Sequence, residues 1–269
     1  MKKLVVSMLV LALAGSAFAA LGDVSSVGLT GLWRFQSSTN KLAATVGTDM
    51  VNSNVDNAGW MTGPWTIIEP GMNDGGIVQD RSWDYLSCYH GIGANGGGDY
   101  VNEYTIAMDV YTGGANWYSL YQTAWGGNAN DGDMWVTPTG TIGNGDTGYS
   151  TLTMDNTKWH RIVLSVDNGN FFRAYVDGVL FLDAAGQSVD GRFSLELDRF
   201  NLFADNSWED SWILCGTVAV WDRALTTAEA GDMGGWISGS ATPTPLTIVP
   251  EPATMAILAL GGLLLRRKK

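Results

Sequence analysis

Apolar and polar residues alternate along residues 159–184, and this alternation is the clearest structural signal in the chain. Apolar side chains take every second position from residue 162 to residue 166, as expected of a strand with one buried face. Residues 167–170, Asp-Asn-Gly-Asn, form a turn signal, and residues 177–178, Asp-Gly, form a second one. The pattern predicts three consecutive antiparallel strands.

Further short runs have the same strand-like composition, and loops rich in Gly, Asn and Asp separate them. They cover residues 29–36, 84–89, 103–112, 117–123, 133–137, 192–204 and 212–222. Short strands with this punctuation predict an all-β fold of two antiparallel sheets, a jelly-roll sandwich. Residues 37–83 lack a clear pattern apart from residues 65–68, and we interpret them as an insertion loop.

One short helix is predicted after the last strand. Glu229 follows Thr226 by three residues, which is the spacing of a capping box, and Gly234 can end the helix. Beyond it, a segment rich in Ser, Thr and Pro reads as an extended linker. The predicted organisation is a leader at 1–19, a domain at 20–238, a linker at 239–249 and a tail at 250–269.

The first 19 residues have the features of a secretory signal peptide. Two lysines precede an apolar run at residues 4–14, and Ala17-Phe18-Ala19 is the small-x-small pattern that signal peptidase cleaves. We therefore expect the chain to be exported.

The tail combines a Pro-Glu-Pro triplet with a short apolar run and a basic end. Pro250, Glu251 and Pro252 precede 13 apolar-rich residues, 253–265, and Arg-Arg-Lys-Lys closes the chain. A helix of that length covers roughly 20 Å, less than the hydrocarbon core of about 30 Å. The tail is therefore predicted to be a weak membrane anchor with its basic end in the cytoplasm.

This order of triplet, apolar helix and basic end resembles the PEP-CTERM sorting signal of Gram-negative, exopolysaccharide-making bacteria. The resemblance implies cleavage by an exosortase near Pro250-Glu251-Pro252, followed by release or transfer to the cell surface. A transient inner-membrane anchor of this kind has no need to be a strong one.

The charge of the chain argues against nucleic acid as a partner. The formal net charge is −12, and loss of the two end signals removes six cations and Glu251, which leaves a still more acidic domain. Such a surface repels phosphate backbones.

Several motifs in the domain resemble the laminin-G-like, concanavalin A-type jelly roll. They are Trp159-His160-Arg161 at a strand start, Tyr175-Val176-Asp177-Gly178 at a hairpin, residues 216–229 leading into the helix, and residues 31–35 in the first strand. The resemblance covers residues 29–235 and implies the sandwich fold. Members of this fold include lectins, adhesion modules and glycanases, so the fold alone leaves the function open.

The carboxylates give little support for a glycanase. Glu196 and Asp198 would share one face of a strand, but Asn201 stands where the resembling β-glucanases have a second glutamate. Without that proton donor we interpret the pair as a solvated strand face and name no catalytic residue. The chain is expected not to be an enzyme.

Aromatic residues suggest a sugar-binding surface. The candidates are Trp117, Tyr121, Trp125 and Trp135, which lie on or beside the strands of residues 103–137 in a setting rich in Asn. Their flat rings could stack on sugar rings, or they could instead fill the core of the sandwich.

No motif requires a cofactor, and calcium is the one candidate ion. Its oxygen ligands would come from loops at residues 128–133 and 203–211, with Asp205 and Asp210 as leading ligands and Asp131 or Asp133 as further ones. Laminin-G-like domains often carry a calcium at the rim, so the resemblance supports this site. Turn formation is the alternative role for these residues.

Two cysteines, Cys88 and Cys215, lie in strand-like runs. An exported protein meets an oxidising compartment, so a disulfide between them is one interpretation. Two buried thiols are the other, and the sequence leaves both open.

The leading hypothesis is an exported, non-catalytic surface or matrix protein whose jelly roll binds an extracellular glycan or a surface protein. A glycoside hydrolase or lyase of the same fold is the first alternative. A purely structural protein associated with exopolysaccharide is the second.

Overall fold

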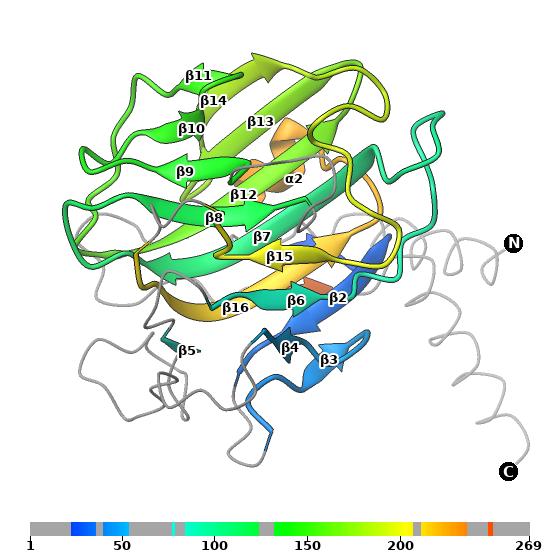
Figure 1. The fold of residues 1–269 in the computed structure, drawn as a ribbon, viewed down its shortest axis with the longest axis horizontal. Helices are drawn as coiled ribbons and strands as arrows, with labels where there is room; N and C mark the ends of the chain where they lie inside the picture. Colours follow the sequence, from blue (N-terminus) through cyan, green and yellow to red (C-terminus); the bar gives the residue numbers. More distant parts are fainter. Residues whose placement is uncertain are drawn as a thin grey trace, which may run out of the picture.

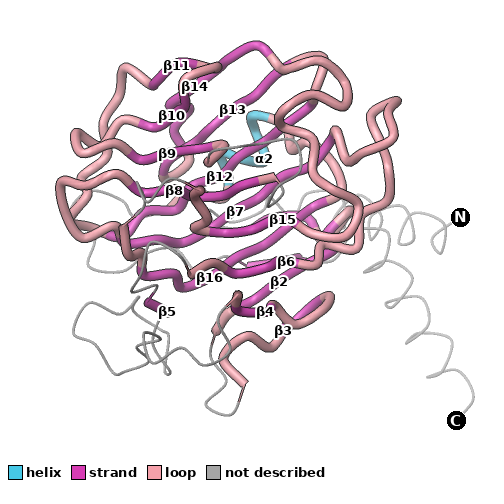
Figure 2. Tube along the Cα trace, viewed as in Figure 1, coloured by secondary structure: helices cyan, strands magenta, loops and turns pink. Residues whose placement is uncertain are grey.

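The computed structural model describes most of the domain and a short segment near the C-terminus. The described residues are 23–35, 40–53, 77–78, 84–123, 132–206, 211–235 and 247–249. Strands and loops make up nearly all of this part of the chain, and α2 (Thr227–Asp232) is its helix (Figure 2).

Most of the described strands form two antiparallel sheets, one in front of the other in Figure 1. The first sheet has seven strands among the described residues. In spatial order they are β11 (Gly148–Tyr149), β10 (Ile142–Asn144), β9 (Met134–Val136), β8 (Tyr118–Gln122), β15 (Phe200–Leu202), β6 (Leu86–Cys88) and β4 (Val51–Asn52).

The second sheet is built around long central strands. Its order, within the described segments, is β14 (Val179–Ala185), β13 (Phe171–Val176), β12 (Trp159–Asp167), β7 (Glu103–Tyr111), β16 (Leu214–Trp221), β2 (Leu29–Trp33) and β3 (Ala44–Val46). A further strand, β5 (Ile77–Val78), pairs with β16. The all-β sandwich expected from the sequence is confirmed.

The main hydrophobic core lies between the two sheets. On β12, Ile162, Leu164 and Val166 belong to this core, and on β15 it takes Phe200 and Leu202. Alternate residues of each strand therefore face the other sheet, as the period of two in the sequence requires. Burial of large side chains from both sheets provides most of the stabilising hydrophobic free energy.

The outer face of the second sheet is also covered. Val163 of β12 and Ala107 of β7 pack in a second cluster with Ala230 of α2. Thr226 and Glu229 form the predicted capping box at the start of this helix, and Gly234 follows its C-terminal cap with a φ of 57°. The helix therefore lies against the sheet, behind it in Figure 1.

A buried ion pair joins the helix to this outer face. Arg161 donates from Nε and Nη2 to the two carboxylate oxygens of Asp109, at 2.7 and 2.9 Å, and from Nη1 to the carbonyl of Met233 at 2.8 Å. Both charged side chains are almost completely buried. An Arg fork of this kind satisfies a buried carboxylate at two points.

Two segments differ from the sequence-based expectation. The strand expected over residues 192–204 is present only at β15, because Leu195 makes an isolated bridge to Val101 and the chain then bends before Phe200. Residues 37–83, interpreted as an insertion loop, contribute β3, β4 and β5. The strand-like residues 65–68 lie outside the described part.

The chain forms a third, two-stranded sheet near its predicted processing sites. β1 (Asp23–Ser25) pairs in parallel with β17 (Thr247–Val249), so the end of the predicted linker is a strand and not wholly without structure. No helix within the described residues is long and apolar enough to span a membrane. The predicted leader with Ala17 and Ala19, and the tail with Pro250, Glu251 and Pro252, lie outside the described part.

Candidate functional site

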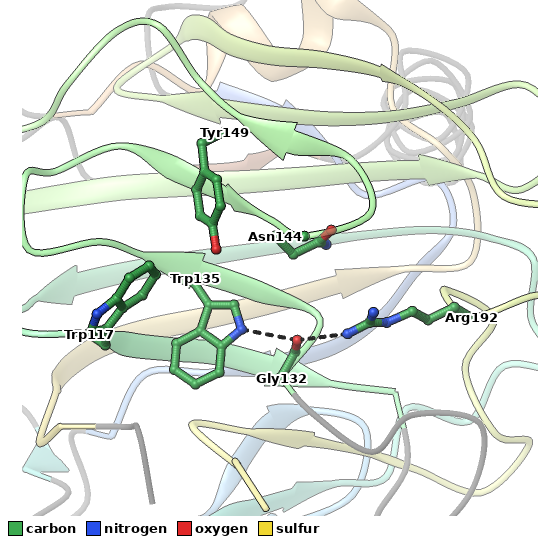
Figure 3. A pocket seen from close by; sticks show the side chains of 7 residues that line it. Trp117, Gly132, Trp135, Asn144, Tyr149 and Arg192 are labelled. Carbon is green, nitrogen blue, oxygen red and sulfur yellow. Dashed lines mark hydrogen bonds between the residues drawn. The ribbon is translucent and has the colours of Figure 1, made fainter. Parts of the chain in front are cut away.

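A pocket of about 240 Å³ opens on the outer face of the seven-stranded sheet (Figure 3). It is lined by Trp117, Gly132, Trp135, Asn144, Gly145, Tyr149 and Arg192. Met134 and Val136 of β9 belong to the core between the sheets, so the intervening Trp135 faces outward.

Strand pairing places the aromatic side chains on this same face. Gly143 of β10 pairs with Trp135 on one side and with Tyr149 of β11 on the other. Directly paired residues of neighbouring strands share a face of the sheet. A Cβ atom at Gly143 would lie 2.7 Å from the Cα of Tyr149, so the close approach of β10 and β11 leaves no room for a side chain between the two aromatic residues.

The three rings form an open cluster. The centroid of Trp117 lies 6.1 Å from that of Trp135 and 6.1 Å from that of Tyr149, and both pairs have edge-to-face geometry. Trp117 is 42% exposed and Tyr149 is 41% exposed, whereas Trp135 is buried. Two large aromatic side chains therefore face solvent beside the pocket.

Gly132 fixes the position of the Trp135 indole. A Cβ atom at this residue would lie 2.9 Å from the ring and 2.6 Å from Oγ of Ser119, so the ring rests directly against the backbone. Its Nε1 donates to the Gly132 carbonyl at 3.1 Å. The side chain is thus locked by packing and by a hydrogen bond, while Trp117 remains the exposed partner.

The polar part of the pocket is centred on Arg192, which lies in the connection between β14 and β15. Its Nε donates to Oδ1 of Asp133 at 2.9 Å, its Nη1 to Oδ2 of Asp146 at 2.6 Å, and its Nη2 to the carbonyl of Gly132 at 3.2 Å (Figure 3 shows the last contact). These three contacts orient the guanidinium at the side of the pocket.

Asp133 is the buried anchor of this arrangement. Its side chain has no solvent exposure, and its Oδ2 accepts the backbone N–H of Thr123 at 2.8 Å. Burial raises the pKa of Asp133 from 3.8 to about 6, against the lowering effects of the Thr123 N–H and Arg192. Asn144 adds a hydrogen bond from Nδ2 to the Asp133 carbonyl.

Asn144 also shapes the loop that carries the second carboxylate. Its Oδ1 accepts the backbone N–H groups of Asp146 and Thr147, both at 2.9 Å. Such turns let an Asn side chain replace a backbone acceptor. Asp146 is therefore held beside Arg192 at the pocket rim, with its side chain 45% exposed.

The structure brings together only some of the aromatic residues that the sequence suggested for sugar binding. Trp117 and Trp135 meet in the pocket, but Tyr121 was a wrong choice. Its ring is fully buried between the sheets, and its hydroxyl lies 3.0 Å from that of Tyr104. Trp125 lies outside the described residues.

Besides two glycines, three residues of the pocket were not identified from the sequence, namely Asn144, Tyr149 and Arg192. Each is distant in sequence from Trp117 and comes from a short strand or a connection without strong periodicity. The turn-rich stretch at residues 144–149 was the available signal for the first two, because turns at a sheet edge often carry binding residues. Nothing local to Arg192 indicated its role.

The proposed calcium ligands do not gather in the described part of the chain. Asp133 does not fit a calcium site, because its carboxylate is held by Arg192 and by the Thr123 N–H. Asp205 is buried, and within the described segments no three Asp, Glu, His or Cys side chains form a metal-binding group. Asp131 and Asp210 lie outside those segments, so a site that uses them stays a prediction.

The suspected glycanase pair also differs from expectation. Glu196 and Asp198 lie in the connection before β15, not on a strand, and Asp198 is exposed. The bend at residues 197–198 follows Leu195, whose single bridge to Val101 belongs to neither sheet. Asn201 stands where the second glutamate would be needed. Its side chain is buried, and its Oδ1 accepts a hydrogen bond from the Ser87 hydroxyl at 3.1 Å.

Cys88 and Cys215 are two buried thiols in the structure, which was the second of the two interpretations left open by the sequence. They lie in different sheets, both are completely buried in the core between the sheets, and they carry thiols and not a disulfide. Burial raises the pKa of the Cys88 thiol well above its usual value.

Comparison with known proteins gives one sequence match and a set of structural neighbours. Residues 249–269 match the PEP-CTERM protein-sorting motif. No curated protein matches the chain.

Two solved structures illustrate the structural likeness. Domain 4 of AbnA, a GH43 extracellular arabinanase from Geobacillus stearothermophilus solved with arabinotriose, has 17% identity and a TM-score of 0.52, covering 77% of this chain and 98% of that one. Trypanosoma rangeli sialidase has 14% identity and a TM-score of 0.57, covering 78% of this chain and 33% of the sialidase. At such identities the likeness shows the fold alone. The chain thus combines a two-sheet β sandwich of the jelly-roll type with a C-terminal PEP-CTERM motif, which indicates export and sorting to the surface.

Proposed function

We propose that this chain is an exported, non-catalytic surface protein of a Gram-negative bacterium that binds carbohydrate in the pocket on the seven-stranded sheet. A signal peptide directs its export, and an exosortase processes its tail. The observation that carries the proposal is the exposed pair Trp117 and Tyr149, set beside the polar groups that surround Arg192.

The chemistry of the pocket suits a sugar. One side of a pyranose or furanose presents apolar C–H groups, which pack on an aromatic face, while its hydroxyls need donors and acceptors at the edge. Trp117 and Tyr149 supply the rings, and Arg192 with Asp146 supplies polar groups. Pre-organisation by Gly132 and Asn144 lowers the entropic cost of binding.

The neighbouring structures support a carbohydrate ligand. The arabinanase domain was solved with arabinotriose, and one sialidase structure of the same fold was solved with sialic acid. These ligands belong to those proteins. They support the class of ligand proposed here and leave its identity to experiment.

The carboxylates at the pocket favour binding over hydrolysis. A retaining glycosidase needs one carboxylate free to attack the sugar and another able to deliver a proton to the leaving oxygen. Asp133 is buried and both of its oxygens accept hydrogen bonds, so it cannot approach a glycosidic bond. The raised pKa of Asp133 results from burial. We assign to Asp133 the role of positioning Arg192.

The test is binding of polysaccharides to the full-length chain purified in detergent, with Trp117→Ala as the variant. A tryptophan presents up to about 250 Å², so 42% exposure leaves roughly 100 Å² for contact. Covering half of it is worth about 1.3 kcal/mol, roughly tenfold in affinity.

Trp212→Ala is the matched control. Trp212 is 38% exposed, stacks on Tyr111 and is not among the residues that line the pocket. We expect Trp117→Ala to weaken binding about tenfold and Trp212→Ala to leave it unchanged. Equal losses in both variants would refute the proposed site, and release of reducing ends from a bound polysaccharide would refute the non-catalytic role.

A further inference from the structure

We propose that the pocket selects an uncharged glycan and disfavours acidic sugars, because Arg192, which lines the pocket, is already paired with two carboxylates. This inference rests on the proposed function and names the class of ligand for the same pocket.

Arg192 is the one cation among the described residues that line the pocket. An exposed arginine in a sugar pocket would ordinarily favour a uronic acid or a sulfated sugar, since its fork matches an anionic group at two points. Here Nε and Nη1 of the fork already donate to Asp133 and Asp146, and Nη2 donates to a backbone carbonyl. The fork is therefore already paired with anions.

The local charge is negative once these contacts are counted. One guanidinium faces two carboxylates within hydrogen-bond distance, and the whole chain has a formal net charge of −12. An incoming carboxylate or sulfate would meet net repulsion at close range, where solvent screening is weakest. A neutral sugar meets no such repulsion.

Arg192 has no unbalanced positive charge to offer an acidic ligand unless one of its two carboxylates is displaced. Asp133 cannot turn away, because it is buried and also accepts the Thr123 N–H. Displacing it would leave a buried charge without its counter-ion. Asp146 is exposed enough to move, although its backbone N–H is held by Asn144.

The groups that remain available suit hydroxyls. Each terminal nitrogen of a guanidinium carries two N–H groups, and for Arg192 one hydrogen bond from each nitrogen is accounted for above. The remaining N–H groups can donate to hydroxyl oxygens, while Asp146 offers its other carboxylate oxygen as an acceptor. Together with the rings of Trp117 and Tyr149, this set matches a polyol with an apolar face.

The experiment compares neutral polysaccharides with charged forms of the same backbone. The probes are glucan, mannan, galactan, xylan and arabinan, each used unmodified and after carboxymethylation, with the full-length chain in detergent at physiological salt. We expect at least one unmodified polysaccharide to bind, and its carboxymethylated form to bind at least fivefold more weakly.

Asp146→Asn is the diagnostic variant. Asparagine keeps an oxygen that can accept from Arg192 but removes one negative charge at the pocket rim. We expect it to improve binding of the carboxymethylated form by roughly fivefold, as loss of one charge at about 5 Å implies in a solvated setting. Asp183→Asn is the matched control, because Asp183 is also exposed and paired with an arginine, Arg173, in the other sheet.

The outcomes separate the two proposals. If a carboxymethylated polysaccharide binds as tightly as its neutral form, the selectivity proposed here is wrong while the glycan-binding function stands. If Asp146→Asn and Asp183→Asn give the same result, the charge balance around Arg192 is not its cause. If none of the probes binds in either form, the proposed function itself falls.

Discussion

Protonation of Asp133 gives the most specific prediction for this site. The perturbation is a fall in pH from 7 to 5, applied to the wild-type chain and to Asp133→Asn. Burial raises the pKa of Asp133 in the folded chain to about 6, compared with 3.8 when the side chain is solvated. The carboxyl group therefore titrates within this pH range in the folded state and below it in the unfolded state.

The sign and size of the effect on stability follow from linkage. Between pH 3.8 and about 6 the folded state holds a proton that the unfolded state has lost, so stability increases as pH falls through this window. The stabilising contribution of Asp133 is fully present below pH 3.8 and is lost above a pH of about 6. A shift of about two units corresponds to about 3 kcal/mol in total, of which about 1 kcal/mol develops between pH 7 and pH 5.

Urea unfolding at pH 7 and pH 5 measures this contribution. We compare how much the free energy of unfolding changes from pH 7 to pH 5 in each protein. We expect this change to be about 1 kcal/mol more favourable in the wild type than in Asp133→Asn. Burial lowers the pKa of His90, which has the opposite effect on stability, but this effect is common to both proteins and cancels in the comparison. An identical pH dependence in the two proteins would refute the assignment.

The same protonation should weaken glycan binding. A neutral carboxyl group holds the guanidinium of Arg192 less strongly than a carboxylate does. As pH falls from 7 to 5, the contribution of Asp133 to stability and the affinity for glycan are therefore expected to change in opposite directions.

Two further predictions concern buried groups away from the pocket. Arg161→Ala leaves the Asp109 carboxylate buried without its guanidinium, so it should lower the free energy of unfolding measured in urea by about 3 to 5 kcal/mol. Arg173→Ala, at the exposed ion pair with Asp183, should lower it by less than about 1 kcal/mol. Similar losses in the two variants would contradict the role given to burial. Cys88 and Cys215 should be unreactive toward a thiol reagent in the folded chain and should titrate as two thiols per chain in denaturant, and the absence of thiols in the unfolded chain would show that a disulfide forms.

Local sequence determined much of the second sheet. Alternation predicted β12, β13 and β14, and the turn between the last two forms because Asp177 and Gly178 both adopt positive φ, 52° and 80°. The capping box at Thr226 was equally predictable, since its hydrogen bonds join residues three apart. Each of these features depends on contacts between near neighbours, which a pattern in one chain records directly.

Tyr121 shows where alternation misleads. A β-bulge between Ser119 and Tyr121 adds one residue to β8, which reverses the alternation beyond it. Tyr121 consequently joins Leu120 in the core, although it shares the parity of the exposed Trp117. A bulge depends on how two strands pair, so the sequence of one strand does not reveal it.

The sequence by itself determined a sandwich of short strands, an exported chain with a sorting tail, and two of the aromatic residues at the site. Only the tertiary structure decided that Tyr149 and Arg192 join Trp117, because pairing of β9, β10 and β11 and the path from β14 to β15 bring together residues that are up to 75 positions apart. It also decided that Arg192 is neutralised by Asp133 and Asp146. Spatial proximity between distant segments arises from sheet topology, and topology is a property of the whole chain.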